Sequence, residues 1–466
     1  MAKALQENPQ TLAWMGDFVA GAGPRYLQIA GFLERGLAQG MLSPGDRLPP
    51  QRELAAHLGV DLTTVTRALN EAKRRKLVES RGALGTFVAP QTAELAQAVD
   101  LSMNVPPPPD GLDLDDMLRR GLTQVTLRAD AHLLMTYQLG GGSAPDRAAG
   151  AAWLRPLLGD VDASRVIACP GAQSALAALI LTRSAPGAAI AAEPLVYPGV
   201  RLAAAQLGRR LLPVATDADG MRPDALDAAC RGQGVRLVYL NPTSQNPTTH
   251  TMPQARRLEL ARVAEAWDAL IVEDDPYWLL TPDAPPPIAA LAPAQTAYVA
   301  TLSKCLSPGL RTAYVVLPGD EAAQDAMLAA LRAFHLMSAP LSTALATQWI
   351  QDGSAGELLA GIRAEASARQ AIARHWLAGA GELSPAGIHL WHRLPAYWSA
   401  ARFSRAALDE HLRVTPSDAF HEGPTPPNAI RISLGGARQR AQLSMGLKRL
   451  ADLLARRPPA ETGLVV

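Results

Sequence analysis

From about residue 112 onward, short apolar runs alternate with segments that have helical periodicity. Runs typical of buried strands lie at VIACP (166–170), VRLVYL (235–240) and TAYVATL (296–302), and helical stretches separate them. Strands that alternate with helices tend to pair in parallel, because each helix crosses one face of the sheet between two strands. The pattern therefore predicts an α/β domain whose mostly parallel sheet is covered on both faces.

The chain is long enough for more than this one domain. Its 466 residues suit two or three domains, and 48% hydrophobic against 19% charged residues gives ample apolar surface to bury. After about residue 340, a long helix near 340–380 is followed by strand-like pieces at 387–394 and 429–434. This change of pattern predicts a smaller C-terminal α+β subdomain.

Charge and cysteine content exclude several classes of protein. The 44 basic and 43 acidic residues give a formal net charge of +1, which excludes a wholly basic nucleic-acid coat but allows a local basic patch. Cys169, Cys230 and Cys305 are too far apart for a CxxC metal site or a disulfide framework, so we expect no metal and a reducing compartment. The N-terminus lacks the apolar core of a signal peptide, and no window approaches 18 apolar residues. We therefore expect a soluble, cytoplasmic protein with no membrane partner.

The first ninety residues follow a different pattern. Helical periodicity and turn signals predict three helices and two short strands, over 25–39, 50–58, about 62–75, 78–80 and 86–88. Gly59 ends the second helix, and Asp61 can cap the third. Two helices joined by a tight glycine turn and followed by a hairpin are the outline of a winged helix-turn-helix.

The outer face of the third helix carries groups suited to nucleic acid. The residues left outside are Thr63, Thr64, Thr66, Arg67 and Asn70. Hydroxyl and amide groups with one arginine suit contacts to phosphates and base edges. The cationic run at 73–76 is either a solvated helix end or part of the same surface.

The stretch PGDRLPPQRELAAHLGVDLTTVTRALNEAKRRKLVESRGALGTFV resembles the DNA-binding domain of GntR-family transcription regulators, over residues 24–89. The resemblance implies a double-stranded DNA operator as partner, contacted by Arg52 and Arg67. It also implies a wing at Arg81–Gly85, with Gly82 in its turn, that reaches the minor groove. In the alternative, Arg52 only braces the packing of the helices.

Lys304 gives the clearest chemical signal in the large domain. It is the one lysine among five that lies deep in this domain, directly after a strand-like run. A lysine in apolar surroundings has a lowered pKa, which an amine needs in order to attack an aldehyde. Thr301, Ser303, Ser307 and Arg311 lie around it and are residue types that hold a phosphate.

Four further segments place polar groups where strands end. They are PGAQSAL (170–176), EPLVYPG (193–199), NPTSQNPT (241–248) and VEDDPY (272–277). The first offers the backbone N–H groups of Ala172 and Gln173 at a helix start, where a phosphate can bind. Open α/β sheets bind ligands at the carboxyl ends of their strands. Together and in this order, these segments resemble the fold-type-I pyridoxal-phosphate aminotransferases, over about residues 99–455.

The resemblance implies roles for individual residues. Lys304 would form a Schiff base with the aldehyde of pyridoxal 5'-phosphate (PLP), Asp274 would pair with the protonated pyridine nitrogen, and Arg431 would grip a substrate carboxylate. The other implied contacts are to the phenolic oxygen (Asn246, Tyr277), to the ring face (Tyr197), and to the phosphate (Ala172, Gln173, Arg311, and Thr301 or Ser303, which compete for one place). Tyr137 would reach the phosphate of a partner subunit across a homodimer interface.

A GntR-type domain joined to an aminotransferase-like domain resembles the MocR subfamily of bacterial regulators. The resemblance implies an N-terminal winged helix-turn-helix at 1–89, a linker at 90–99, and a PLP-binding domain at 100–466 whose C-terminal subdomain begins at about 340. The expected fold class is α/β, with a fold-type-I PLP-transferase domain as its larger part. The expected function is a transcription regulator that senses PLP, or an amino acid or amine, through Schiff-base chemistry at Lys304. The alternative is a working PLP-dependent aminotransferase acting on an amino acid, because the same residues serve both.

Overall fold

The structure is a computed structural model that describes most of the chain between residues 23 and 458. Described are residues 23–38, 41–42, 45–75, 77–80, 82, 85–89, 99–128, 130–281, 283–319, 321–377, 387–423 and 425–458. All of the expected linker but its last residue therefore lies outside the described residues. The chain divides into two compact units, which we call the N-terminal unit (Met1–Gln97) and the C-terminal unit (Ala98–Val466).

The N-terminal unit has three helices followed by a hairpin among its described residues. The elements are α1 (Arg25–Ala38), α2 (Gln51–Leu58), α3 (Leu62–Arg74), β1 (Val78–Ser80) and β2 (Thr86–Val88), with the two strands antiparallel. Gly59 ends α2 in the left-handed conformation, with φ of 60°. The Asp61 carboxylate caps α3, because it accepts a hydrogen bond of 2.7 Å from the N–H of Thr64. Val65 and Leu69 bury the inner face of α3 in a common core. The predicted winged helix-turn-helix is confirmed.

The C-terminal unit is built on a seven-stranded sheet that is mostly parallel, as predicted. Its strands are β4 (Val166–Cys169), β5 (Ala189–Ala192), β6 (Arg210–Pro213), β9 (Leu237–Leu240), β10 (Leu270–Asp275), β11 (Thr296–Thr301) and β12 (Ala313–Val316). They lie in the order β4-β12-β11-β10-β9-β5-β6. β12 runs antiparallel to β4 and β11, and the other neighbouring pairs are parallel.

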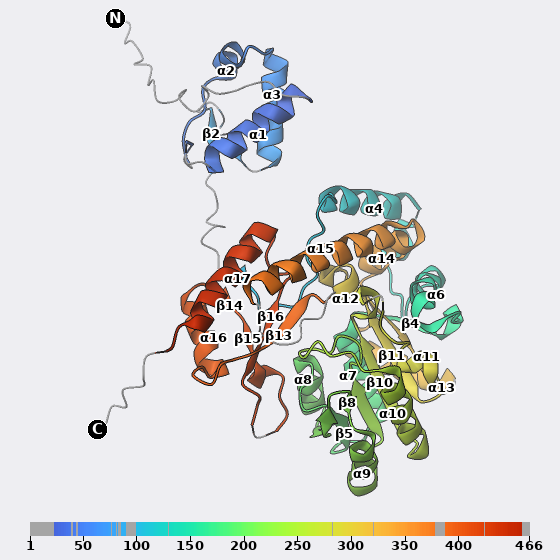
Figure 1. Ribbon diagram of the computed structural model, residues 1–466. Coiled ribbons are helices and arrows are strands. Elements are labelled where there is room, and N and C mark those ends of the chain that lie inside the picture. Colours follow the sequence, from blue (N-terminus) through green and yellow to red (C-terminus); the bar gives the residue numbers. More distant parts are fainter. Residues whose placement is uncertain are drawn as a thin grey trace, which may run out of the picture. The chain divides into compact units, whose positions relative to one another are not determined.

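Helices cover both faces of this sheet (Figure 1). They include α6 (Ala144–Leu158), α7 (Ala172–Arg183), α8 (Pro198–Gln206), α9 (Pro223–Gln233), α10 (Gln254–Ala266), α11 (Ile288–Leu291) and α13 (Glu321–His335). Successive strand residues point to opposite faces. Val272 accordingly packs in the core formed with α7 and α8, and Ile271 packs in the core formed with α9 and α10.

The C-terminal subdomain has a second, three-stranded sheet in the order β13-β16-β15, antiparallel throughout. Its elements are β13 (His389–Arg393), α16 (Ala400–Asp409), β14 (Leu412–Arg413), β15 (Thr415–Pro416), β16 (Ala429–Ser433) and α17 (Arg440–Ala455). The prediction of a single long helix near 340–380 is wrong. The structure has α14 (Pro340–Gln351) and α15 (Ser354–Trp376), separated at Gly353, whose φ of 87° a right-handed helix cannot continue through.

Short elements complete the C-terminal unit. They are β3 (Val99–Asp100), α4 (Leu114–Arg128), α5 (Ala131–Leu134), β7 (Thr216–Asp217), β8 (Gly220–Met221) and α12 (Leu302–Cys305). β3 pairs in parallel with β14, so the chain enters this unit beside the C-terminal subdomain. No helix in the described ranges is long and apolar enough to cross a membrane.

Candidate functional site

The residues expected around a cofactor come mainly from the carboxyl ends of neighbouring strands. Asp274 lies near the end of β10, and Thr301 ends the adjacent β11, immediately before α12 with Lys304. β12 then places Thr301 opposite Ala313, and Ala313 opposite Cys169 at the end of β4, where α7 follows. The register of four strands therefore brings three of the sequence motifs to one edge of the sheet.

Lys304 lies mostly buried at this edge. Its Nζ donates a hydrogen bond to the main-chain oxygen of Asn104. Burial and the positive charges of Arg431 and Arg311 lower the pKa of Lys304 to about 8, against the opposing effect of Asp274. A larger fraction of this amine is therefore neutral near pH 7 than in an exposed lysine, and the neutral form is the nucleophile.

Asp274 is 5% exposed, and only one of its two carboxylate oxygens accepts a hydrogen bond from a described residue. Its Oδ2 accepts a hydrogen bond of 2.8 Å from the hydroxyl of Tyr239 on β9, a residue that the sequence analysis missed. Its Oδ1 is buried and has no hydrogen-bond partner among the described residues. Burial raises the pKa of Asp274 to about 7. A buried acceptor without a donor is costly, so this oxygen fits the N–H of a protonated pyridine ring.

The start of α7 forms a cradle together with Arg311. Gly171 precedes this helix with a φ of 88°, and a Cβ there would lie 2.7 Å from Nη2 of Arg311. The guanidinium group therefore rests against the backbone of the helix start. The first N–H groups of a helix, here those of Ala172 and Gln173, have no intrahelical partner. Backbone donors and a fixed cation together suit a phosphate.

Thr301 and Ser303, the two alternatives for one phosphate contact, lie within hydrogen-bond distance of each other. The Thr301 hydroxyl donates to Ser303 Oγ over 3.0 Å and also caps α12 by accepting from the Ser303 N–H. Both side chains are buried at the same place, so they form one hydroxyl pair beside Lys304.

The side chains of Tyr197 and Gln173 both lie close to the backbone of Gly199. Tyr197 precedes α8, and the side chain of Gln173 donates to the carbonyl oxygen of Gly199 over 2.8 Å. A Cβ at Gly199 would lie 2.2 Å from Gln173 Oε1 and 2.3 Å from Tyr197 Cε1, so only glycine fits. Burial raises the pKa of Tyr197, which keeps its hydroxyl protonated.

Arg431 lies on β16 of the C-terminal subdomain and is 7% exposed. Its Nη1 donates to Asn246 Oδ1 over 2.8 Å, and its Nη2 donates to the main-chain oxygen of Ser102. Its guanidinium carbon lies 4.9 Å from the ring centre of Phe420, and its Nε has no partner among the described residues. Asn246 and Arg431, which were predicted separately as site residues, are therefore in direct contact.

Tyr277 is almost fully buried after β10, and Asn104 donates to its hydroxyl over 2.8 Å. Asn104 was not among the predicted site residues, because it lies in a proline-rich segment without a motif. Asn104 touches both Tyr277 and Lys304, so it belongs to the same site.

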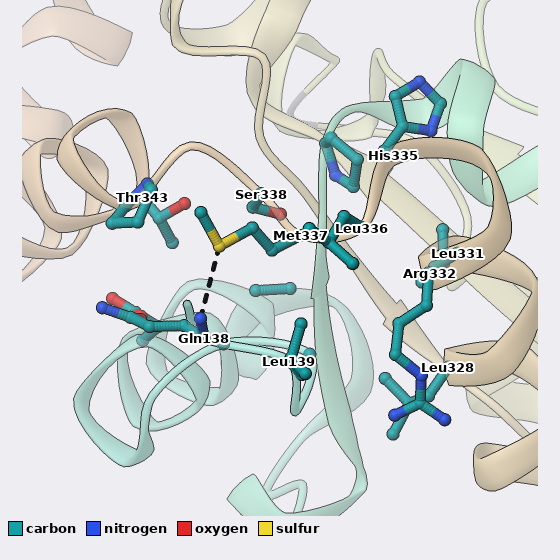
Figure 2. A pocket seen from close by; sticks show the side chains of 16 residues that line it. Gln138, Leu139, Leu328, Leu331, Arg332, His335, Leu336, Met337, Ser338 and Thr343 are labelled. Atoms are coloured by element: carbon teal, nitrogen blue, oxygen red, sulfur yellow. Dashed lines mark hydrogen bonds between the residues drawn. The ribbon is translucent and has the colours of Figure 1, made fainter. Parts of the chain in front are cut away.

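Tyr137 is not brought to these residues. Its side chain is 70% exposed, between α5 and α6. The next residue, Gln138, lines a separate small pocket, where its N–H lies 3.3 Å from Sδ of Met337 (Figure 2). Lys304 and Arg431 do not line this pocket. The expected contact of Tyr137 with a partner subunit stays a prediction.

The residues expected to contact DNA lie on α2 and α3. Arg52, Thr63 and Arg67 are exposed, and the guanidinium carbon of Arg67 lies 4.6 Å from the ring centre of Tyr26. The Thr64 hydroxyl donates to the Asp61 carboxylate over 2.7 Å. The Thr66 hydroxyl donates to Gln51 Oε1 over 2.9 Å. These two hydroxyls already serve to fix α3 within its unit.

The hairpin and the cationic run are described in part. Gly82 and Gly85 have φ of 57° and 109°, as a tight turn needs, whereas Arg81 lies outside the described residues. In the run at 73–76, Arg74 and Arg75 both bind the Glu71 carboxylate, and Lys76 is not described. This pairing lowers the positive charge that the run presents to a ligand.

Comparison with known proteins supports the folds described for both units. The family model described as "Bacterial regulatory proteins, gntR family" matches residues 25–88. The uncharacterized HTH-type transcriptional regulator YdeF of Bacillus subtilis (strain 168) is 28% identical over 95% of this chain and 97% of its own. The HTH-type pyridoxine biosynthesis transcriptional regulator PdxR of Corynebacterium glutamicum is 30% identical over 63% of this chain and 66% of its own.

A solved structure supports the fold of the C-terminal unit. The α-aminoadipate aminotransferase LysN of Thermus thermophilus superposes with a TM-score of 0.69, over 77% of this chain and 92% of its own, at 25% identity. The gntR match at the N-terminus, the similarity to YdeF over almost the whole chain and the aminotransferase fold of the C-terminal unit occur together in this chain. With a gntR-family N-terminal domain and an aminotransferase-like C-terminal unit, the chain has the architecture of the MocR subfamily of GntR-type transcription regulators.

Proposed function

We propose that this protein is a transcription regulator that binds a double-stranded DNA operator through its N-terminal unit and senses PLP, or an amino acid or amine, in its C-terminal unit. One observation carries the proposal. Lys304 offers an amine of lowered pKa, and the nearby Asp274 offers a buried oxygen that lacks a donor. PLP carries both complementary groups, an aldehyde and a pyridine nitrogen that becomes a donor when protonated. The printed name of PdxR concerns pyridoxine biosynthesis, and LysN was solved with a phosphopyridoxyl-leucine, which supports the same cofactor.

PLP supplies an aldehyde that condenses reversibly with amines and a ring that withdraws electrons. The residues of this chain would hold and orient it. Asp274 Oδ1 would accept from the pyridine N–H, and Tyr197 would cover the ring face. The phosphate would bind the N–H groups of Ala172 and Gln173, with Arg311 and the hydroxyl pair of Thr301 and Ser303 around it. Asn246 and Tyr277 would face the phenolic oxygen.

Arg431 would select the effector. Its guanidinium group is buried, is held by Asn246, and uses one further N–H on the main-chain oxygen of Ser102. A carboxylate can take the place of this carbonyl oxygen and accept two parallel hydrogen bonds, which an arginine fork favours. The effector class that fits is therefore an amino acid or an amine with a carboxylate.

The proposed organisation places the DNA-binding domain at 1–89, the linker at 90–99 and the cofactor domain at 100–466, in a cytoplasmic homodimer. Tyr137 would reach the phosphate of the partner subunit. An effector can change DNA binding only if it binds two dimer geometries with different affinity. The sensing step is therefore a difference in effector affinity between two states of the dimer.

Two measurements on the purified full-length protein test this function. With PLP, we expect a protein-bound visible absorption band that Lys304→Ala abolishes. An amino acid that shifts this band should also change the affinity for double-stranded DNA selected by the protein from a random pool. Absence of the band in the unmodified protein, or a shifted band with unchanged DNA affinity, would contradict the proposal.

The second candidate function is transamination, which the intact set of Lys304, Asp274, Asn246, Tyr277 and Arg431 favours. In that case the amino acid would convert the cofactor to its aminated form, and a keto acid would restore the original band. A lasting new band that keto acids do not reverse supports sensing without turnover. Full cycling with both partners would instead support an active aminotransferase.

A further inference from the structure

Asn104 is a buried polar residue outside every motif that the sequence offered. It is 6% exposed, in the extended segment that follows β3. Its main-chain oxygen accepts from Lys304 Nζ, and its side-chain Nδ2 lies 2.8 Å from the Tyr277 hydroxyl and 3.2 Å from Nδ1 of His389. One residue therefore touches the reactive amine with its backbone and a cofactor-facing hydroxyl with its side chain.

The amide nitrogen Nδ2 of Asn104 can only donate, and this sets the direction of both hydrogen bonds. His389 is fully buried on β13, and burial together with the charge of Arg431 lowers its pKa to about 3. The ring is therefore neutral, so that Nδ1 can accept from Asn104. The amide of Asn104 then gives one hydrogen to His389 and the other to the Tyr277 oxygen. Its own Oδ1 is buried without a partner among the described residues.

We propose that Asn104 is a positioning residue for the cofactor, which acts through Tyr277 by donating to its oxygen and so leaving the hydroxyl hydrogen free to point at the phenolic oxygen of PLP. This inference rests on the proposed function. A hydroxyl that accepts a hydrogen bond becomes a better donor itself, because chains of hydrogen bonds polarise one another. The charged groups that act on Tyr277 are Asp274 and Arg431, with Tyr197 as a further titratable neighbour, and none of them donates to its oxygen among the described hydrogen bonds.

The consequence is measurable in the bound cofactor. A donor at the phenolic oxygen stabilises its anionic form and so lowers the pKa of the cofactor's linkage to Lys304. Loss of the Asn104 amide weakens this donor. We expect Asn104→Ala to raise the pKa of the linkage by about 0.5 units, the equivalent of one modest hydrogen bond. Tyr277→Phe removes the donor altogether and should raise it further.

The experiment is a pH titration of the visible absorption band of the PLP-loaded protein. The variants are Asn104→Ala, Tyr277→Phe and the double variant, with Asn428→Ala as control, because its amide binds main-chain oxygens of Pro395 and Trp398 instead. The double variant should match Tyr277→Phe, since Asn104 acts only through Tyr277. Asn104→Asp nearly preserves the shape and reverses the hydrogen bond, so it should also raise the pKa if Asn104→Ala does not fold.

Each outcome decides the question. An unchanged pKa in Asn104→Ala, or additive shifts in the double variant, overturns the positioning role. A lowered pKa would show that Tyr277 donates to Asn104, which also overturns it. If the unmodified protein forms no band, the proposed function itself fails, and this result is distinct from the other three.

Discussion

Replacing Lys304 by methionine should make the cofactor-free protein more stable at pH 7. The pKa of Lys304 is lowered from 10.5 to about 8. At about 1.36 kcal/mol per unit, the buried ammonium group costs the folded state about 3 kcal/mol below pH 8. Methionine removes this cost but leaves the Asn104 oxygen without the hydrogen bond from Nζ, which is worth about 1 kcal/mol. We therefore expect Lys304→Met to raise the free energy of unfolding by about 2 kcal/mol at pH 7.

This advantage of Lys304→Met should disappear as the pH rises. Between about pH 8 and 10.5 the unfolded chain keeps the lysine proton that the folded chain has lost, so the stability contributed by this group rises with pH. The advantage of Lys304→Met over the unmodified protein should therefore shrink by about 2 kcal/mol from pH 7 to pH 9.5.

Urea unfolding followed by tryptophan fluorescence can measure this difference. Seven of the eight tryptophans lie beyond residue 97, so the signal reports the C-terminal unit. Lys448→Met is the matched control, because Lys448 is exposed on α17 and its replacement should change stability by at most about 0.5 kcal/mol. If Lys304→Met is less stable than the unmodified protein at pH 7, and by the same amount at pH 9.5, then burial of the lysine charge is not costly and the reasoning is refuted.

Three further predictions concern single residues. Asp61→Ala removes the cap of α3 and should cost about 1 kcal/mol, so amides of α3 should exchange with deuterium about five-fold faster, whereas unchanged exchange would deny the cap a role. Arg67→Ala should weaken binding to selected DNA about ten-fold or more in a gel shift and leave the PLP band intact; normal DNA binding would exclude Arg67 from the interface. Arg431→Lys should weaken the response of the visible band to amino acids about ten-fold and spare amines without a carboxylate, because the bidentate fork is lost. An equal loss for both classes would show that Arg431 does not anchor the carboxylate.

The features that sequence could predict depend on short-range patterns. The cap of α3 joins residues three positions apart, and the strand that precedes Lys304 is a single apolar run, so both are visible in a few residues. Arg431 and Asn246 are 185 residues apart, and only the resemblance to a known fold assigned both to one site. Asn104 and Tyr277 are 173 residues apart without any motif at Asn104, so their contact was missed. The break between α14 and α15 was also missed, since apolar periodicity continues on both sides of Gly353.

The pairing of β3 with β14 decides where the N-terminal unit is tethered. Val99 and Leu101 are buried in the core of the C-terminal subdomain, and the chain passes so close to Gly436 that a Cβ there would lie 1.8 Å from the Asp100 oxygen. The first described residues of the C-terminal unit are thus packed into the core that carries the three-stranded sheet. Lys304 follows a strand of the larger sheet and Arg431 lies on the smaller, so a ligand bound to both residues would bridge the two sheets of the C-terminal unit.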